Sequence, residues 1–214
     1  MATKKTKDKI LSAYKDYVLT HGQKPNSVYA FCKDLKIKES DFYEFFRTFE
    51  QIESDYLASV FMNTYDNLKN DEQFQAYSVR EKVLSILFTH FQELTEDRSF
   101  IVALSSQKSD LKEKMSLWKS YRHEVIDAME QVLAQAGEED NIPNRPLLSA
   151  RYKDMLWLNV SFVFHFWLKD DSKGFENTDA CIEKSVNLTL DLLQKNTLDH
   201  AIDFGKFIFQ SMKK

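Results

Sequence analysis

The chain has 214 residues, of which 43% are hydrophobic and 29% charged, and its formal net charge is −4. These values are typical of a soluble globular protein. Only 4 glycines and 3 prolines occur; because turns and strand bends use both heavily, their scarcity argues against a strand-rich chain and predicts an all-α fold.

Positive charge is concentrated at the start of the chain. Residues 1–40 contain nine lysines and four acidic residues, so the remainder is net acidic. A basic head on an acidic body suits a nucleic acid bound at one end, and a solvated lysine-rich terminus explains the same charges.

The longest apolar stretch, residues 155–168, is too short to span a bilayer and predicts a buried helix without a membrane partner. Residues 1–9 run directly into an amphipathic segment, so no signal peptide is expected and a cytoplasmic location is predicted. Cys32 and Cys181 have no metal-like spacing and are expected to be buried, reduced thiols.

Apolar residues recur at three- and four-residue intervals and predict a series of helices. Gly22 is expected to end the first helix, Asn26 or Ser27 to cap the second, and Thr48 to cap the fourth. Residues 69–75 form a polar separator. The predicted helices cover residues 6–21, 28–35, 39–46, 50–68, 78–94, 96–107, 110–136, 146–169, 177–194 and 198–212.

The first three predicted helices are compact, and the tight turn Lys36-Ile37-Lys38 joins the second to the third. This is a helix-turn-helix layout, in which the third helix can enter the major groove of DNA. Helical triplets of this kind also occur in proteins that do not bind DNA.

Residues 9–57 resemble the N-terminal domain of tetracycline-repressor (TetR) family regulators. The order and spacing of short motifs agree over nearly 50 residues. The matching motifs are Ile10-Leu11-Ser12-Ala13, Gly22, Ser27-Val28, Phe31-Cys32-Lys33, Ile37, Phe42-Tyr43-Glu44-Phe45-Phe46 and Arg47-Thr48-Phe49-Glu50-Gln51-Ile52.

The resemblance implies a DNA-binding domain at residues 1–50 and a helical ligand-binding and dimerisation domain at residues 51–214. It implies a transcriptional regulator, most simply a repressor, that binds a palindromic double-stranded DNA operator. Ser27 can present its hydroxyl to a phosphate, and Tyr43 can bond the DNA backbone. The residues expected at the DNA interface are Ser27, Lys36, Lys38, Glu39, Ser40, Asp41, Tyr43 and Arg47.

Several positions depart from the family pattern. Lys36 replaces the usual Gly in the turn, Lys38 replaces the usual Ser or Thr before the third helix, and Phe49 replaces a Lys. The third helix also carries acids that repel phosphates, although an acid can accept a hydrogen bond from cytosine N4. Two hypotheses stay open: a repressor with an atypical sequence preference, and a same-fold ligand- or lipid-binding protein whose head has weakened or lost DNA binding. The acidic residues of the third predicted helix are Glu39, Asp41 and Glu44.

The apolar helix at 155–168 predicts a homodimer, since one of its faces can pack on the body and the other needs a second subunit. Apolar stripes on the two C-terminal helices fit the same bundle, and a large monomeric bundle is the alternative. The stripes are Ile182, Val186, Leu190 and Leu193, followed by Ile202, Phe204, Ile208 and Phe209.

The resemblance further implies a pocket for a small hydrophobic ligand inside the body. For any one candidate, ordinary core packing is the simpler role. His165 lies between two phenylalanines and, if buried, needs a partner such as a ligand, Asn159 or Ser161. The candidates are Phe88, His90, Phe91, Trp118, Tyr121, Trp157, Phe162 and His165.

No catalytic motif occurs in the sequence. It contains no glycine-rich phosphate loop, no His-Glu-x-x-His, no Gly-x-Ser-x-Gly and no cysteine pair with metal spacing. The sequence therefore predicts no enzymatic activity, no catalytic residue, no cofactor and no metal site.

Overall fold

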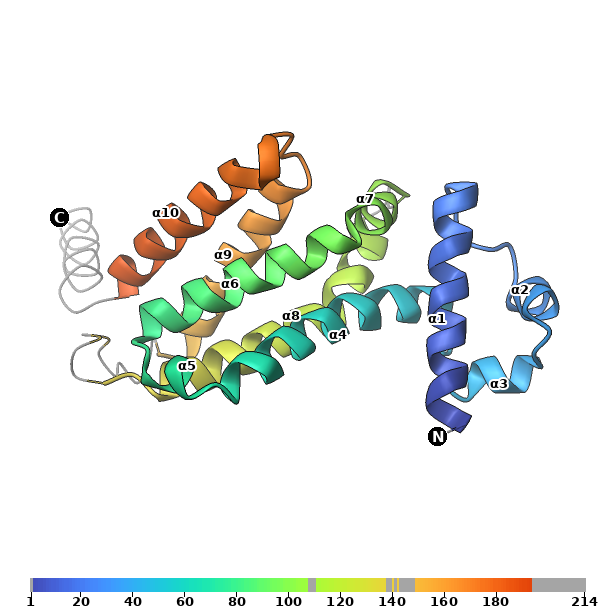
Figure 1. The fold of residues 1–214 in the computed structure, drawn as a ribbon, viewed down its shortest axis with the longest axis horizontal. Helices are drawn as coiled ribbons and strands as arrows, with labels where there is room; N and C mark the ends of the chain where they lie inside the picture. The colour runs from blue at the N-terminus through green and yellow to red at the C-terminus, as the bar shows by residue number, and fades with distance from the viewer. Residues whose placement is uncertain (1, 108–110, 138–139, 141, 143–148, 194–214) are drawn as a thin grey trace, which may run out of the picture. The chain divides into compact units, whose positions relative to one another are not determined.

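The computed structural model describes residues 2–107, 111–137, 140, 142 and 149–193 (Figure 1). Every regular element among them is helical, which confirms the all-α prediction. The predicted helix at 198–212 lies outside the described residues. The helices are α1 (Ala2–His21), α2 (Val28–Leu35), α3 (Glu39–Tyr43), α4 (Phe49–Lys69), α5 (Glu72–Ala76), α6 (Val79–Glu96), α7 (Arg98–Gln107), α8 (Leu111–Ala134), α9 (Ser149–Trp167), the 3-10 turn η2 (Lys173–Phe175) and α10 (Glu176–Leu193).

Two details differ from the sequence prediction. The third helix ends at Tyr43, although hydrogen-bonded turns continue to Phe46. The polar separator at 69–75 contains a short helix, α5, which the apolar periodicity did not indicate. Asp71 caps α5 by accepting the amide of Gln73 at 2.7 Å, and the buried Phe74 fixes the helix to the protein.

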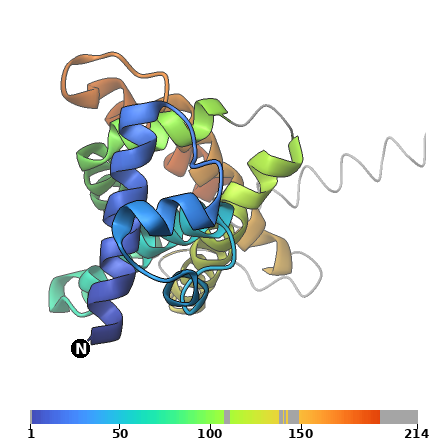
Figure 2. The same cartoon turned by 90° about the vertical axis from the view of Figure 1, so that its right-hand side faces the viewer.

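One compact unit comprises residues 1–62 and 93–123. The predicted apolar face of α1 is confirmed, because Ile10, Tyr14 and Val18 are fully buried. Gly22 ends α1 in the left-handed conformation, with φ of 66°, and its amide donates to the carbonyl of Val18. This unit holds the whole helix-turn-helix layout, and its three helices face the viewer in Figure 2.

The second compact unit comprises residues 63–92 and 124–214. Here α9 and α10 pack side by side (Figure 1), and Asn159 of α9 donates a hydrogen bond of 3.2 Å to Thr189 of α10. Three buried rings, Phe91, Phe164 and Trp167, lie between 5.6 and 6.3 Å apart by their centroids. The unit therefore has its own aromatic core.

A carboxylate organises the turn from α9 into α10. Asp170 accepts the amide of Ser172 at 2.9 Å, and it accepts the amide and hydroxyl of Thr178 at 2.8 and 2.6 Å. Burial alone would raise the pKa of Asp170, but these hydrogen bonds outweigh it and lower that pKa to about 2. The turn is thus held by an ionised, buried group.

Candidate DNA-binding head

The centre of the head is a cluster of aromatic rings. Phe31 of α2, Phe42 of α3 and Phe49 of α4 lie with ring centroids 5.5 to 6.3 Å apart, and Tyr14 of α1 stacks on Phe49 at 5.3 Å. Phe49 is the residue that replaces the usual family Lys. Its burial explains the departure, because here the position contributes to the head core instead of offering a cation to DNA.

The second helix begins as its sequence predicts. The Ser27 hydroxyl accepts the amide of Ala30 at 3.2 Å, so Ser27 caps α2. The helix ends at Leu35, and its C-cap residue, Lys36, has a left-handed backbone with φ of 56° and ψ of 43°. Glycine adopts that conformation without a steric penalty, so the geometry explains both the family preference for Gly and the strain at Lys36 in this chain.

The third helix is capped by one of its own acids. The Asp41 carboxylate accepts the amide of Lys38 at 3.0 Å. Phe42 and Phe46 are buried as predicted, whereas Phe45 is half-buried. Tyr43 projects outward with 53% of its surface exposed.

All but one of the residues predicted at the DNA interface are exposed on the head, and Asp41 is the half-buried exception. The exposed set is Ser27, Lys36, Lys38, Glu39, Ser40, Tyr43 and Arg47. The backbone amide of Arg47 is bonded to Gln51 at 2.9 Å, so this residue is fixed at the start of α4. Thr48 accepts the amide of Gln51, which confirms the predicted cap.

Sequence reasoning missed Tyr29, an aromatic side chain on α2 with 62% of its surface exposed. It lies two positions after the Ser27 cap. The sequence contained one signal for its exposure: Tyr29 falls outside the apolar helix face formed by the buried Phe31 and Cys32. An exposed tyrosine beside a helix start can stack on or bond to a nucleic acid backbone.

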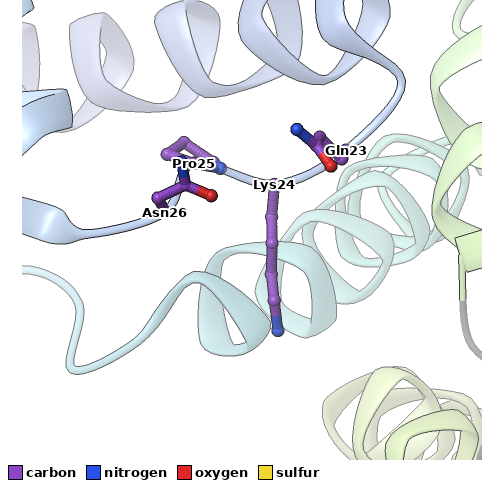
Figure 3. A pocket seen from close by; sticks show the side chains of 4 residues that line it. All are labelled: Gln23, Lys24, Pro25 and Asn26. Atoms are coloured by element: carbon purple, nitrogen blue, oxygen red, sulfur yellow. The ribbon is translucent and has the colours of Figure 1, made fainter.

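The loop between α1 and α2 borders an open pocket of about 420 Å³, lined by Gln23, Lys24, Pro25 and Asn26 (Figure 3). Lys24 forms an ion pair with Glu50 at the start of α4. Burial tends to raise the pKa of Glu50, but the bond from Lys24 prevails and lowers it. The pair holds this loop against α4.

The residues predicted to line a ligand pocket are distributed over both compact units. Phe91 lies in the aromatic core of the second unit, and Tyr121 packs with Phe61 and Trp118 in the first. The remaining positions are Phe88 and Phe162, which are exposed, and Trp157, which is half-buried.

His165 is not buried in the single chain, so the need for a buried partner does not arise there. Its side chain is exposed, and Nδ1 lies 2.7 Å from the carbonyl oxygen of Ser161 one turn earlier. His90 is the fully buried imidazole instead, and burial lowers its pKa to about 3.

Helices α9 and α10 pack side by side and each exposes large apolar side chains, which we together term the α9–α10 face. Leu158 and Leu188 are 65% and 62% exposed, and Phe162 is 58% exposed. The predicted stripe of Ile182, Val186, Leu190 and Leu193 is buried within the chain itself, so a different set of α10 side chains is exposed. The α9–α10 face consists of Leu158, Phe162, Phe166, Leu188 and Leu192.

A helix-turn-helix layout followed by a larger helical body defines a two-part, all-α protein of the helix-turn-helix class. Residues 82–208, more than half of the chain, match the family model described as the tetracyclin repressor-like C-terminal domain. The chain therefore belongs to the TetR family of regulators. The match lies in the body and is independent of the motifs in residues 9–57.

Regulators of this family are generally not enzymes. No curated protein matches the chain. Within the part of the chain that the structure describes, no helix combines the length and apolarity needed to cross a bilayer.

Proposed function

We propose that this protein is a cytoplasmic transcriptional repressor that binds a palindromic DNA operator as a homodimer and releases it when a small hydrophobic ligand occupies the body. The observation that carries the proposal is the exposed rim of the head. Tyr43 on α3 and the Ser27 cap on α2 offer hydroxyl groups, and Lys36 and Lys38 offer ammonium groups, around a rigid aromatic core.

The structure reduces the electrostatic objection to DNA binding. Of the three acids in the third helix region, Asp41 is half-buried and engaged by the amide of Lys38. Glu39 and Glu44 remain exposed and weaken the attraction for phosphates. This supports a modest, strongly salt-dependent affinity with an atypical base preference, rather than loss of binding.

The α9–α10 face supports the homodimer. Its side chains come from adjacent helices, and contiguous apolar patches are uncommon on the surface of monomers. A two-fold interface would place the same patch from each subunit in contact, and two heads would then read two half-sites. Family membership supports ligand sensing, and a ligand that favours a mismatched head spacing would lower operator affinity.

The test is a fluorescence-anisotropy titration of the purified chain against the DNA upstream of its own coding sequence, at several salt concentrations. We expect specific binding that weakens with salt, with a logarithmic slope of about −0.9 for each phosphate contacted. Lys38→Ala should reduce that slope by about 1 and Tyr43→Phe should lower affinity at every salt concentration. Lys119→Ala, at an exposed position on α8, is the matched control.

Binding no stronger than to unrelated DNA, with and without extracted hydrophobic compounds, would reject the repressor. It would favour a ligand- or lipid-binding protein of the same fold. Unchanged binding in Tyr43→Phe and Lys38→Ala would reject the assignment of the contacts.

A further inference from the structure

Two carboxylates connect α1 to other helices of the first compact unit. Glu53 of α4 accepts a hydrogen bond of 2.5 Å from the hydroxyl of Tyr14. Asp97, between α6 and α7, is bonded at both oxygens: Oδ1 accepts from the Lys15 ammonium of α1, and Oδ2 accepts from the Tyr56 hydroxyl of α4. Three helices of the unit therefore meet at Asp97.

Asp97 occupies an unusual position for such a contact. Its backbone carbonyl accepts the amide of Ile101 at 3.1 Å, so the residue lies at the N-cap of α7. An aspartate there ordinarily accepts amides from the first turn of its own helix. The carboxylate of Asp97 is bonded instead by side chains of α1 and α4, so it connects separate helices rather than capping its own helix.

The hydrogen bonds of Asp97 lie in a partly buried environment beside aromatic rings. Phe100, fully buried in α7, contacts the ring of Tyr14 at 6.3 Å and that of Tyr56 at 5.2 Å, both edge-on. The side chains of Lys15 and Asp97 are only 29% and 25% exposed. Partial burial raises the pKa of Asp97, yet the bonds from Lys15 and Tyr56 prevail and lower it, so the carboxylate is ionised at neutral pH.

We propose that Asp97 is a positioning residue for the DNA-binding head: by holding Lys15 and Tyr56 at the start of α7, it fixes the orientation of α1 and hence the spacing of the two heads in the dimer. The inference rests on the proposed function, because spacing matters only when two heads bind one operator. The inference extends the proposed function, because it distinguishes the residues that contact DNA from Asp97, which would position them.

Loss of this positioning contact should affect a single half-site and the full operator differently. A head that has lost its orientation still binds a single half-site, because its own contact surface is intact. The full operator loses affinity, because the second head then has a lower effective concentration at its half-site. A contact residue such as Tyr43 affects the half-site and the full operator alike.

The experiment compares the affinities of the full-length chain for a palindromic operator and for an isolated half-site. Asp97→Asn and Lys15→Met should each weaken operator binding about tenfold and change half-site binding by less than about twofold. The double variant should be no weaker than the worse single variant, because both remove one interaction. Lys153→Met is the matched control: Lys153 forms a 2.7 Å ion pair with Glu130, has a 30% exposed side chain and lies outside the cluster.

Hydrogen–deuterium exchange on the same variants, without DNA, provides an independent measurement. Asp97→Asn should accelerate exchange in α1 and in the first turn of α7 about tenfold while α9 remains unchanged. Unchanged exchange in α1 overturns the proposal whatever the DNA result, and so does an equal loss of half-site and operator affinity. If the wild-type chain binds no operator, the repressor function and the spacing role fail together, and exchange alone decides whether Asp97 orients α1.

Discussion

The backbone amide of Lys38 donates a hydrogen bond of 3.0 Å to the carboxylate of Asp41, three residues further along the chain. Asp41 is thereby committed to the start of α3, where a lysine takes the place of the usual capping Ser or Thr. The acidic character of this helix is therefore partly structural. Only Glu39 and Glu44 remain as exposed acids on the predicted recognition segment.

Removing the exposed acids should strengthen DNA binding. We expect Glu39→Gln and Glu44→Gln each to raise affinity by about two- to fivefold at low salt, because a like charge near phosphates is lost. Asp41→Asn should instead destabilise the head by about 1 kcal/mol through its cap. Anisotropy titrations and thermal unfolding measure the two effects, and a loss of affinity confined to Glu39→Gln would mean that Glu39 contacts a base.

Lys36 combines a charge with a strained backbone, and two substitutions separate them. Lys36→Gly should stabilise the protein by about 0.5–1 kcal/mol, because the left-handed conformation penalises every side chain that has a Cβ atom. Lys36→Ala removes the same charge and keeps the strain, so it should bring no gain. Both should lower the salt slope of DNA binding by about 1. Equal stability of the two variants in denaturant titrations would contradict this explanation.

Asp170 should stabilise the body only while it is ionised. Its pKa in the folded state, about 2, is below the ordinary pKa of an aspartate. Asp170 therefore stabilises the folded state fully above that ordinary pKa, and this stabilisation is lost as the pH falls through 2. Asp170→Asn should lower the free energy of unfolding by about 2 kcal/mol at pH 7, and the difference should shrink below pH 4. Asp171→Asn, at the exposed neighbouring position, is the control; equal effects of the two variants would argue against the capping role.

His90 should make the protein sensitive to mild acid. Burial lowers its pKa to about 3, so the folded state keeps the imidazole neutral while the unfolded chain gains a proton below about pH 6.5. Stability should therefore fall between pH 6.5 and 3, by up to about 1.4 kcal/mol per pH unit. His90→Gln should remove this component, and His123→Gln, on the exposed part of α8, should keep it. Parallel pH profiles for wild type and His90→Gln would disprove the assignment.

The α9–α10 face should determine the oligomeric state. Phe162→Glu places a charge in the apolar face, and we expect it to convert a dimer into a monomer at micromolar concentration, since an unpaired charge is costly to bury. Val102→Glu, at an exposed apolar position on α7, should leave the dimer intact. Light scattering measures both, and a monomeric wild type would refute the interface.

The sequence by itself determined the helical class, most helix boundaries and the head, because these depend on local information: apolar spacing, the Ser27 and Thr48 caps and the Gly22 stop. The division of the chain at residue 50 and the roles of the individual DNA and ligand residues remain predictions. The short helix α5 escaped detection because five residues are too few to show a period.

Only the tertiary structure decided which polar and apolar groups meet. Tyr56 and Asp97 are 41 residues apart, and Lys15 and Asp97 are 82 apart, so no local pattern could pair them. Periodicity marked 155–168 as apolar all round, but only the fold decided that Leu158 and Phe162 are exposed while Val163 and Phe164 are buried. Burial depends on the neighbours that the fold supplies, and those neighbours are distant in the sequence.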